Sequence, residues 1–129
     1  MKKLMIYFAA GSIGALANSV ALWWLGYYGF TARFNISIAP HFDPAWLYPR
    51  IVWGGLWGLL FILPMLQSRL LFKGLLISLA PTAVQLLLIF PQAGKGLGGT
   101  ELGIYTPILV LLVNGVWGLA AALSIRLAR

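Results

Sequence analysis

Long apolar runs alternate with short charged segments along the whole chain. Four runs of 18 to 29 residues contain no Asp, Glu, Lys or Arg. A bilayer hydrocarbon core of about 30 Å needs about 20 mostly apolar residues in a helix, and a helix pairs its own backbone polar groups in lipid. The pattern therefore predicts an all-α membrane protein with four transmembrane helices, at Leu4–Gly26, Arg50–Leu66, Leu70–Phe90 and Ile104–Ile125.

The composition supports this class of protein. Of the 129 residues, 61% are hydrophobic and 9% are charged, whereas about 25% of the residues in a typical soluble domain are charged. So few charges cannot cover a water-soluble fold of this size, which excludes an ordinary soluble enzyme and a nucleic-acid-binding module. The absence of cysteine excludes disulfides and thiolate metal sites.

The distribution of the cations predicts the orientation. With four spans, both termini and the loop between the second and third helices share one side of the membrane. That side carries six Lys or Arg residues, whereas the other side carries three, together with both acidic residues. Because cytoplasmic loops are enriched in Lys and Arg, we expect both termini in the cytoplasm. The net charge of +7 then reflects topology and contact with anionic lipid.

Two sequence echoes indicate an internal repeat within a single domain, 1–129. Residues 55–59 (GLWGL) recur as 115–119 (GVWGL), and residues 16–19 (LANS) are echoed by 79–82 (LAPT). The repeats would be two tandem helical hairpins, 1–66 and 70–129, related by an axis along the membrane normal. Coincidence in a chain rich in Gly, Leu and Trp is the alternative.

Polar residues near the middle of the predicted spans form the sharpest candidate site. Three amides are expected at similar depth on three helices, and a proline in the third helix frees a backbone carbonyl, that of Ile77, which Ser78 or Thr82 is placed to satisfy. Two interpretations stay open: interhelical hydrogen bonds that hold the bundle together, or coordination of a small solute or ion. The cluster consists of Asn18, Ser78, Pro81, Thr82, Gln85 and Asn114.

No ionisable side chain is expected in the middle of a span. Arg50 opens the second predicted helix, and Lys73, at the inner end of the third, is expected to extend its ammonium group to the headgroups. Proton relays and ion-coupled pumps usually place charged residues inside the membrane. The sequence therefore argues against a proton-coupled transporter, but not against a neutral pore.

The loops carry motifs without a supporting context. Residues 94–99 (GKGLGG) match G-x-G-x-x-G but follow a membrane helix, whereas a dinucleotide site needs a strand in a βαβ unit. His41 and Asp43 supply two ligands where metal sites usually need three or four. We expect Asp43 to stabilise the loop around Pro40 and Pro44 instead. We predict no catalytic residues, no cofactor and no metal.

One loop segment is too apolar for a free loop. Phe34, Ile36 and Ile38 alternate with two polar residues, so an extended segment would present all three on one face. We expect this face to dock on lipid, on the second hairpin or on a partner subunit.

Two families share features with the chain. Small fluoride channels have a similar length and a motif like Gly11-x-x-Gly14-Ala15, but their arginine is replaced by Asn18-Ser19 here, so that assignment is rejected. The second half, from Gly74-Leu75-Leu76 through Phe90-Pro91 to Val116-Trp117, resembles YagU-type bacterial inner-membrane proteins. That resemblance implies the bacterial inner (plasma) membrane and no assigned chemistry.

These observations predict a small non-enzymatic membrane protein, a structural or accessory subunit of a membrane assembly. The alternative is an oligomeric channel or facilitator for a small neutral solute or ion. The expected partners are the lipid bilayer and either further copies of the chain or other membrane subunits, with no nucleic acid.

Overall fold

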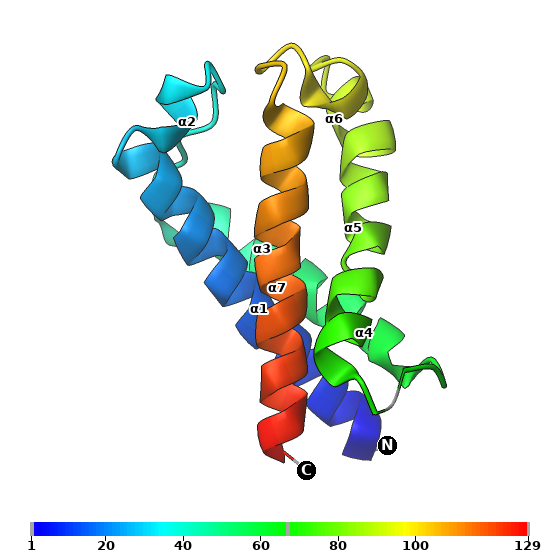
Figure 1. Ribbon diagram of the computed structural model, residues 1–129. Helices are drawn as coiled ribbons and strands as arrows, with labels where there is room; N and C mark the ends of the chain where they lie inside the picture. Colours follow the sequence, from blue (N-terminus) through cyan, green and yellow to red (C-terminus); the bar gives the residue numbers. More distant parts are fainter. Residues whose placement is uncertain (1, 67, 129) are drawn as a thin grey trace.

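Four apolar helical spans form a bundle in the computed structural model, which describes residues 2–66 and 68–128 (Figure 1). The spans are Lys2–Tyr27, Pro44–Ile62, Leu70–Gln92 and Thr106–Ala128. Both termini lie at one end of the bundle, called the terminal end here, and the two long loops lie at the other, the loop end. The predicted fold class, an all-α membrane protein with four candidate spans, is confirmed.

Two of the spans are continuous α-helices and two are composite. The first is α1 (Lys2–Tyr27), and the last is α7 (Thr106–Ala128). The second joins α3 (Pro44–Gly58) to a 3₁₀ turn, η1 (Leu59–Ile62). The third joins α4 (Leu70–Ile77), α5 (Leu79–Val84), a π-helical turn η2 (Gln85–Ile89) and α6 (Phe90–Gln92). The loops contain the short helices α2 (Phe30–Arg33) and η3 (Leu97–Gly99).

The second span begins six residues earlier than predicted, which changes the position of Arg50. The Asp43 carboxylate caps the helix by accepting a hydrogen bond from the Trp46 backbone N–H at 3.0 Å, and Pro44 is the first helical residue. Both residues are typical of helix starts. With a rise of about 1.5 Å per residue, Arg50 lies about 9 Å inside the span. The prediction that Arg50 opens the second span was therefore wrong.

The third span is interrupted around Pro81, where a backbone N–H is missing. The Ser78 hydroxyl donates to the Leu75 carbonyl oxygen at 2.6 Å, and the Thr82 hydroxyl donates to the Ser78 carbonyl oxygen at 2.7 Å. Because each hydroxyl has one proton to donate, neither satisfies the carbonyl of Ile77, contrary to expectation. The π-turn η2 follows directly, and such turns occur often at functional sites.

Close helix contacts at glycine hold the terminal half together. A Cβ added to Gly58 would lie 2.8 Å from the Cα of Gly11, and a Cβ added to Gly74 would overlap the carbonyl oxygen of Gly118. Small residues permit such close approach of helices in lipid. The first contact joins the two helices of the first predicted hairpin, and the second contact joins those of the second hairpin. In the predicted repeat, Gly11 corresponds to Gly74 and Gly58 corresponds to Gly118. The repeat itself stays a prediction.

Lys73 is buried rather than extended to the headgroups. Its side chain is 1% exposed, and its Nζ donates to the carbonyl oxygens of Phe61 and Leu63, at 2.8 and 2.6 Å. The last carbonyls of a helix have no partner within the helix, and the second span ends here, at Ile62. The ammonium group therefore caps the second span, which the sequence pattern did not predict.

Candidate functional site

A chain of hydrogen bonds joins all four spans. The Arg50 Nη2 donates to the Asn18 side-chain oxygen at 2.6 Å. The Asn18 amide donates to the Asn114 oxygen at 2.9 Å, and the Asn114 amide donates to the Thr82 hydroxyl oxygen at 2.9 Å. We call these four residues the polar network. It brings together Asn18, Thr82 and Asn114 of the predicted cluster and adds a charged residue to them.

Arg50 has neutral partners only, as far as the described residues go. Its Nε donates to the Ser19 hydroxyl oxygen at 2.9 Å, and its guanidinium carbon lies 4.7 Å from the centre of the Trp46 ring. Within residues 2–66 and 68–128, its hydrogen-bond partners are Ser19 and Asn18, and neither is acidic. A positive charge inside a membrane span without a carboxylate partner is costly unless another anion compensates it.

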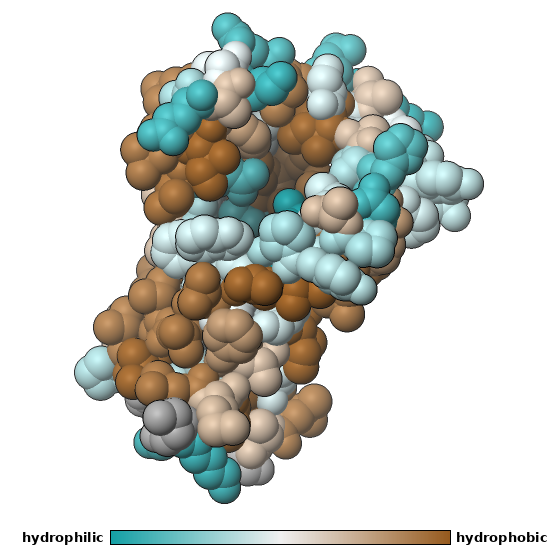
Figure 2. Space-filling view, turned by 180° about the vertical axis from the view of Figure 1, so that it is seen from behind, coloured by the Kyte–Doolittle hydropathy of each residue, from teal (hydrophilic) through white to brown (hydrophobic). Residues whose placement is uncertain are grey.

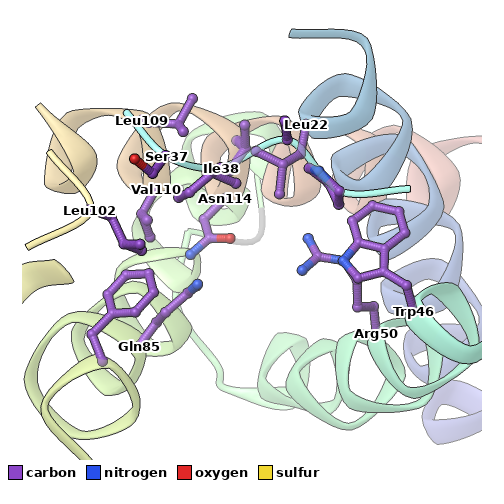
Figure 3. A pocket seen from close by; sticks show the side chains of 14 residues that line it. Leu22, Ser37, Ile38, Trp46, Arg50, Gln85, Leu102, Leu109, Val110 and Asn114 are labelled. Atoms are coloured by element: carbon purple, nitrogen blue, oxygen red, sulfur yellow. The ribbon is translucent and has the colours of Figure 1, made fainter. Parts of the chain in front are cut away.

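Arg50 borders a cavity at the loop end with a volume of about 340 Å³ (Figure 3). Arg50, Gln85 and Asn114 point into this space from three different helical elements, α3, η2 and α7. Backbone and side chains of the first loop, residues 37–40, form the wall nearest the loop end. The remaining lining is mostly apolar, and it consists of Leu22, Trp46, Phe90, Leu102, Leu109, Val110 and Val113.

A second, larger cavity of about 610 Å³ meets the first at the same three polar residues. It lies between α3, which contributes Trp53 and Trp57, and the third span, which contributes Leu88 and Ile89. On the face of the molecule that is hidden in Figure 1, the surface is hollowed in the loop-end half, and hydrophilic atoms are visible at the base of the hollow (Figure 2). The combination of two apolar cavities and a shared polar floor is typical of a ligand-binding site.

The other members of the predicted cluster have distinct positions. Ser78 contributes its backbone carbonyl oxygen to the network through Thr82. Pro81 lines the second cavity, and Gln85 lines both cavities. The Gln85 side chain forms no hydrogen bond with the part of the chain that the structure describes, so its amide is available to a ligand.

The apolar loop segment folds back on its own bundle. Ile36 is buried against Leu22, Leu109 and Val113, and Ile38 packs on the same cluster. The Ser37 backbone N–H donates to the Leu102 carbonyl oxygen at 2.8 Å, which ties the two loops together over the first cavity. Phe34 is exposed. Docking on the second hairpin therefore explains the burial of the Ile36 side chain. Contact of Phe34 with lipid or with a partner subunit stays a prediction.

Sequence reasoning missed Arg50, Ser19 and Trp46 as site residues. The signal that could have found Arg50 is the pair Asp43-Pro44, a helix start six residues before the predicted start at Arg50. Trp46 then lies one helical turn before Arg50, the spacing at which helix side chains contact each other. Ser19 follows Asn18 directly and carried no separate signal.

The loop motifs do not contribute to this site. Gly94, Gly96, Gly98 and Gly99 have positive φ angles, so residues 94–99 form a tight glycine-dependent turn. Asp43 caps α3 as described. Among the described residues, no group of three or more His, Asp or Glu side chains could hold a metal ion.

No protein family model, curated protein or solved structure matches this chain. The resemblance of the second half to YagU-type proteins stays a prediction, and the site is interpreted from its own geometry.

Proposed function

We propose that the chain is a non-enzymatic membrane protein that binds an anionic molecule in the loop-end cavities. The observation that carries the proposal is the Arg50 guanidinium, which has no acidic partner among residues 2–66 and 68–128 and borders both cavities beside two amides. Arginine is well suited to carboxylate and phosphate groups because its planar fork donates two parallel hydrogen bonds. Gln85 and Asn114 supply further polar groups on the opposite walls.

A purely structural role explains the amides but not the arginine. Amide hydrogen bonds between helices stabilise a bundle by about 0.6 to 2 kcal/mol each. A guanidinium has five N–H donors, and two of its N–H groups bond to Ser19 and Asn18. Its remaining donors have no partner among the described residues. An anion in the cavity would satisfy them and compensate the charge.

Binding is favoured over conduction by the packing below the network. The terminal half is filled by an apolar cluster that includes Ala10, Phe61, Trp117 and Ala121, all at most 3% exposed. The Trp117 ring N–H also donates to the Gly11 carbonyl oxygen at 3.0 Å, which joins α7 to α1. A polar solute would have to cross this cluster to pass through one chain. We therefore place the channel alternative second.

Titration with inorganic phosphate tests the binding proposal. Trp46 contacts the guanidinium, and Trp53 and Trp57 line the second cavity, so a bound anion should change tryptophan fluorescence. We expect a saturable change when purified protein in a neutral detergent is titrated with phosphate at constant ionic strength. A linear or absent response to phosphate, with no change in melting temperature, would contradict the proposal.

We further propose that both termini face the cytoplasm and that the membrane is the bacterial inner membrane. We also propose that the protein is part of a larger assembly, formed either with further copies of itself or with other membrane subunits.

Cysteine labelling tests the orientation. Ala39 and Thr100 are exposed at the loop end, and Ser68 and Ala128 are exposed at the terminal end. Cysteines at the first two positions should react with an impermeant reagent in intact cells, and those at the last two should not. The reverse pattern would overturn the proposed orientation.

A further inference from the structure

The second cavity indicates where the ligand comes from. We propose that the ligand is an anionic amphiphile of the bilayer, a molecule with a phosphate or carboxylate head and an alkyl or isoprenoid tail. It enters sideways between α3 and η2, its head binds at Arg50, and its tail lies in the second cavity. This inference rests on the proposed anion-binding function and names the class of ligand.

The two walls of the second cavity belong to spans that pack on different neighbours. α3 packs on α1, whereas α4 and α5 pack on α7. α3 and η2 therefore face each other across the cavity, which Ala15 and Trp117 also line. Such an arrangement gives the cavity an opening that is directed sideways, into the plane of the bilayer, and not along the bundle axis.

The residues at the rim of this opening are apolar and exposed. Trp53 is 62% exposed on one side, and Leu88 and Ile89 are 54% and 53% exposed on the other. At the depth of a membrane span these side chains contact lipid tails. An alkyl chain can therefore pass between them without leaving an apolar environment, whereas a free ion would have to be stripped of water to follow the same route.

The polarity of the site matches an amphiphile. Arg50, Gln85 and Asn114 meet at the junction of the two cavities. Away from the junction the second cavity is lined mainly by large apolar side chains, with Gln92 as a polar exception. Its volume of about 610 Å³ lies within the usual range for pockets that enclose small molecules, about 300 to 1,000 Å³.

The first loop borders the first cavity at the loop end. Residues 37–40 line the first cavity on that side, and the Ser37–Leu102 backbone hydrogen bond holds this segment against the second loop. An oxyanion from water and the headgroup of an amphiphile would share the same chemistry at Arg50. The large apolar side chains of the second cavity, Trp53, Trp57 and Leu88, favour the amphiphile.

Dodecyl phosphate is the probe that tests this inference. Inorganic phosphate is the comparison ligand, because it has the same phosphate group but no alkyl tail. Calorimetric titration of the full chain in a neutral detergent should show dodecyl phosphate binding at least tenfold more tightly than inorganic phosphate. Leu88→Trp, which narrows the second cavity, should weaken dodecyl phosphate binding at least tenfold and leave inorganic phosphate binding unchanged.

Leu87→Trp is the matched control, because Leu87 is similarly exposed (58%) but does not line the cavity. It should bind both probes as the unmodified protein does. If dodecyl phosphate binds no more tightly than inorganic phosphate, or if Leu88→Trp and Leu87→Trp behave alike, the amphiphile inference fails while anion binding stands. If inorganic phosphate does not bind the unmodified protein, the proposed function itself fails.

Discussion

Arg50→Gln is expected to abolish phosphate binding while the protein stays folded. Removing one partner of a desolvated charge pair costs about 2 to 5 kcal/mol of binding free energy, which corresponds to an affinity loss of about thirtyfold or more. The fold should tolerate the change because glutamine can still donate to Asn18. The substitution also removes a buried positive charge, which destabilises the fold when it has no anionic partner. Fluorescence titration with phosphate measures the affinity, and thermal unfolding measures the stability.

Two further variants make this result specific to the site. Arg50→Lys keeps the charge but loses the planar fork, so phosphate should bind at least tenfold more weakly than to the unmodified protein. Arg33→Gln is the control, because Arg33 is an exposed loop-end arginine that also lies near an aromatic ring, at 5.8 Å from the centre of Phe30. It should bind phosphate normally. Equal losses in Arg33→Gln and Arg50→Gln would show a general charge effect and contradict the site.

Asn114→Leu is expected to cause the largest loss of stability among variants of the polar network. The Asn114 side chain accepts from Asn18 and donates to Thr82, so its removal leaves the buried Asn18 N–H group without an acceptor and the Thr82 hydroxyl oxygen without a donor, although Thr82 still donates to Ser78. Each unsatisfied group costs about 1 to 3 kcal/mol. Thermal unfolding in detergent should therefore show a clear fall in melting temperature. Phosphate affinity should also fall, because Asn18 then no longer positions the guanidinium.

Ser124→Ala provides the matched control on the same helix. The Ser124 hydroxyl donates to the Ala120 carbonyl oxygen at 2.8 Å, within α7, and links no other span. Its removal should change the melting temperature little. If Asn114→Leu unfolds at the temperature of Ser124→Ala, the hydrogen bonds from α7 to α1 and α5 do not hold the bundle together.

The fold class was predictable because lipid leaves few alternatives. Uncharged runs long enough to cross a bilayer must form helices, and the four runs became the four spans. The bounds were less predictable where local chemistry competes with hydropathy. The helix cap at Asp43 starts the second span before the uncharged run begins. At the other end of this span, the buried Lys73 ammonium group donates to the carbonyl oxygen of Phe61.

The candidate site was predictable in part, for a related reason. Polar residues within apolar helices stand out in a sequence, and Asn18, Thr82 and Asn114 do meet in the structure. Arg50 did not stand out because it was assigned to the edge of a span, where arginine is ordinary. The cavities depend on how α3 and the third span diverge around the network, which no local pattern encodes.

The most direct test of the anion site is to locate a bound anion in a crystal of the protein. Selenate is a suitable probe because it has the tetrahedral shape of phosphate and selenium gives an anomalous signal. The proposed site predicts an anomalous peak at the junction of the two cavities, with selenate oxygens within hydrogen-bond distance of the Arg50 guanidinium and near Gln85 and Asn114. A junction without a peak at saturating selenate, or with selenate bound only at surface cations such as Lys95, would contradict it.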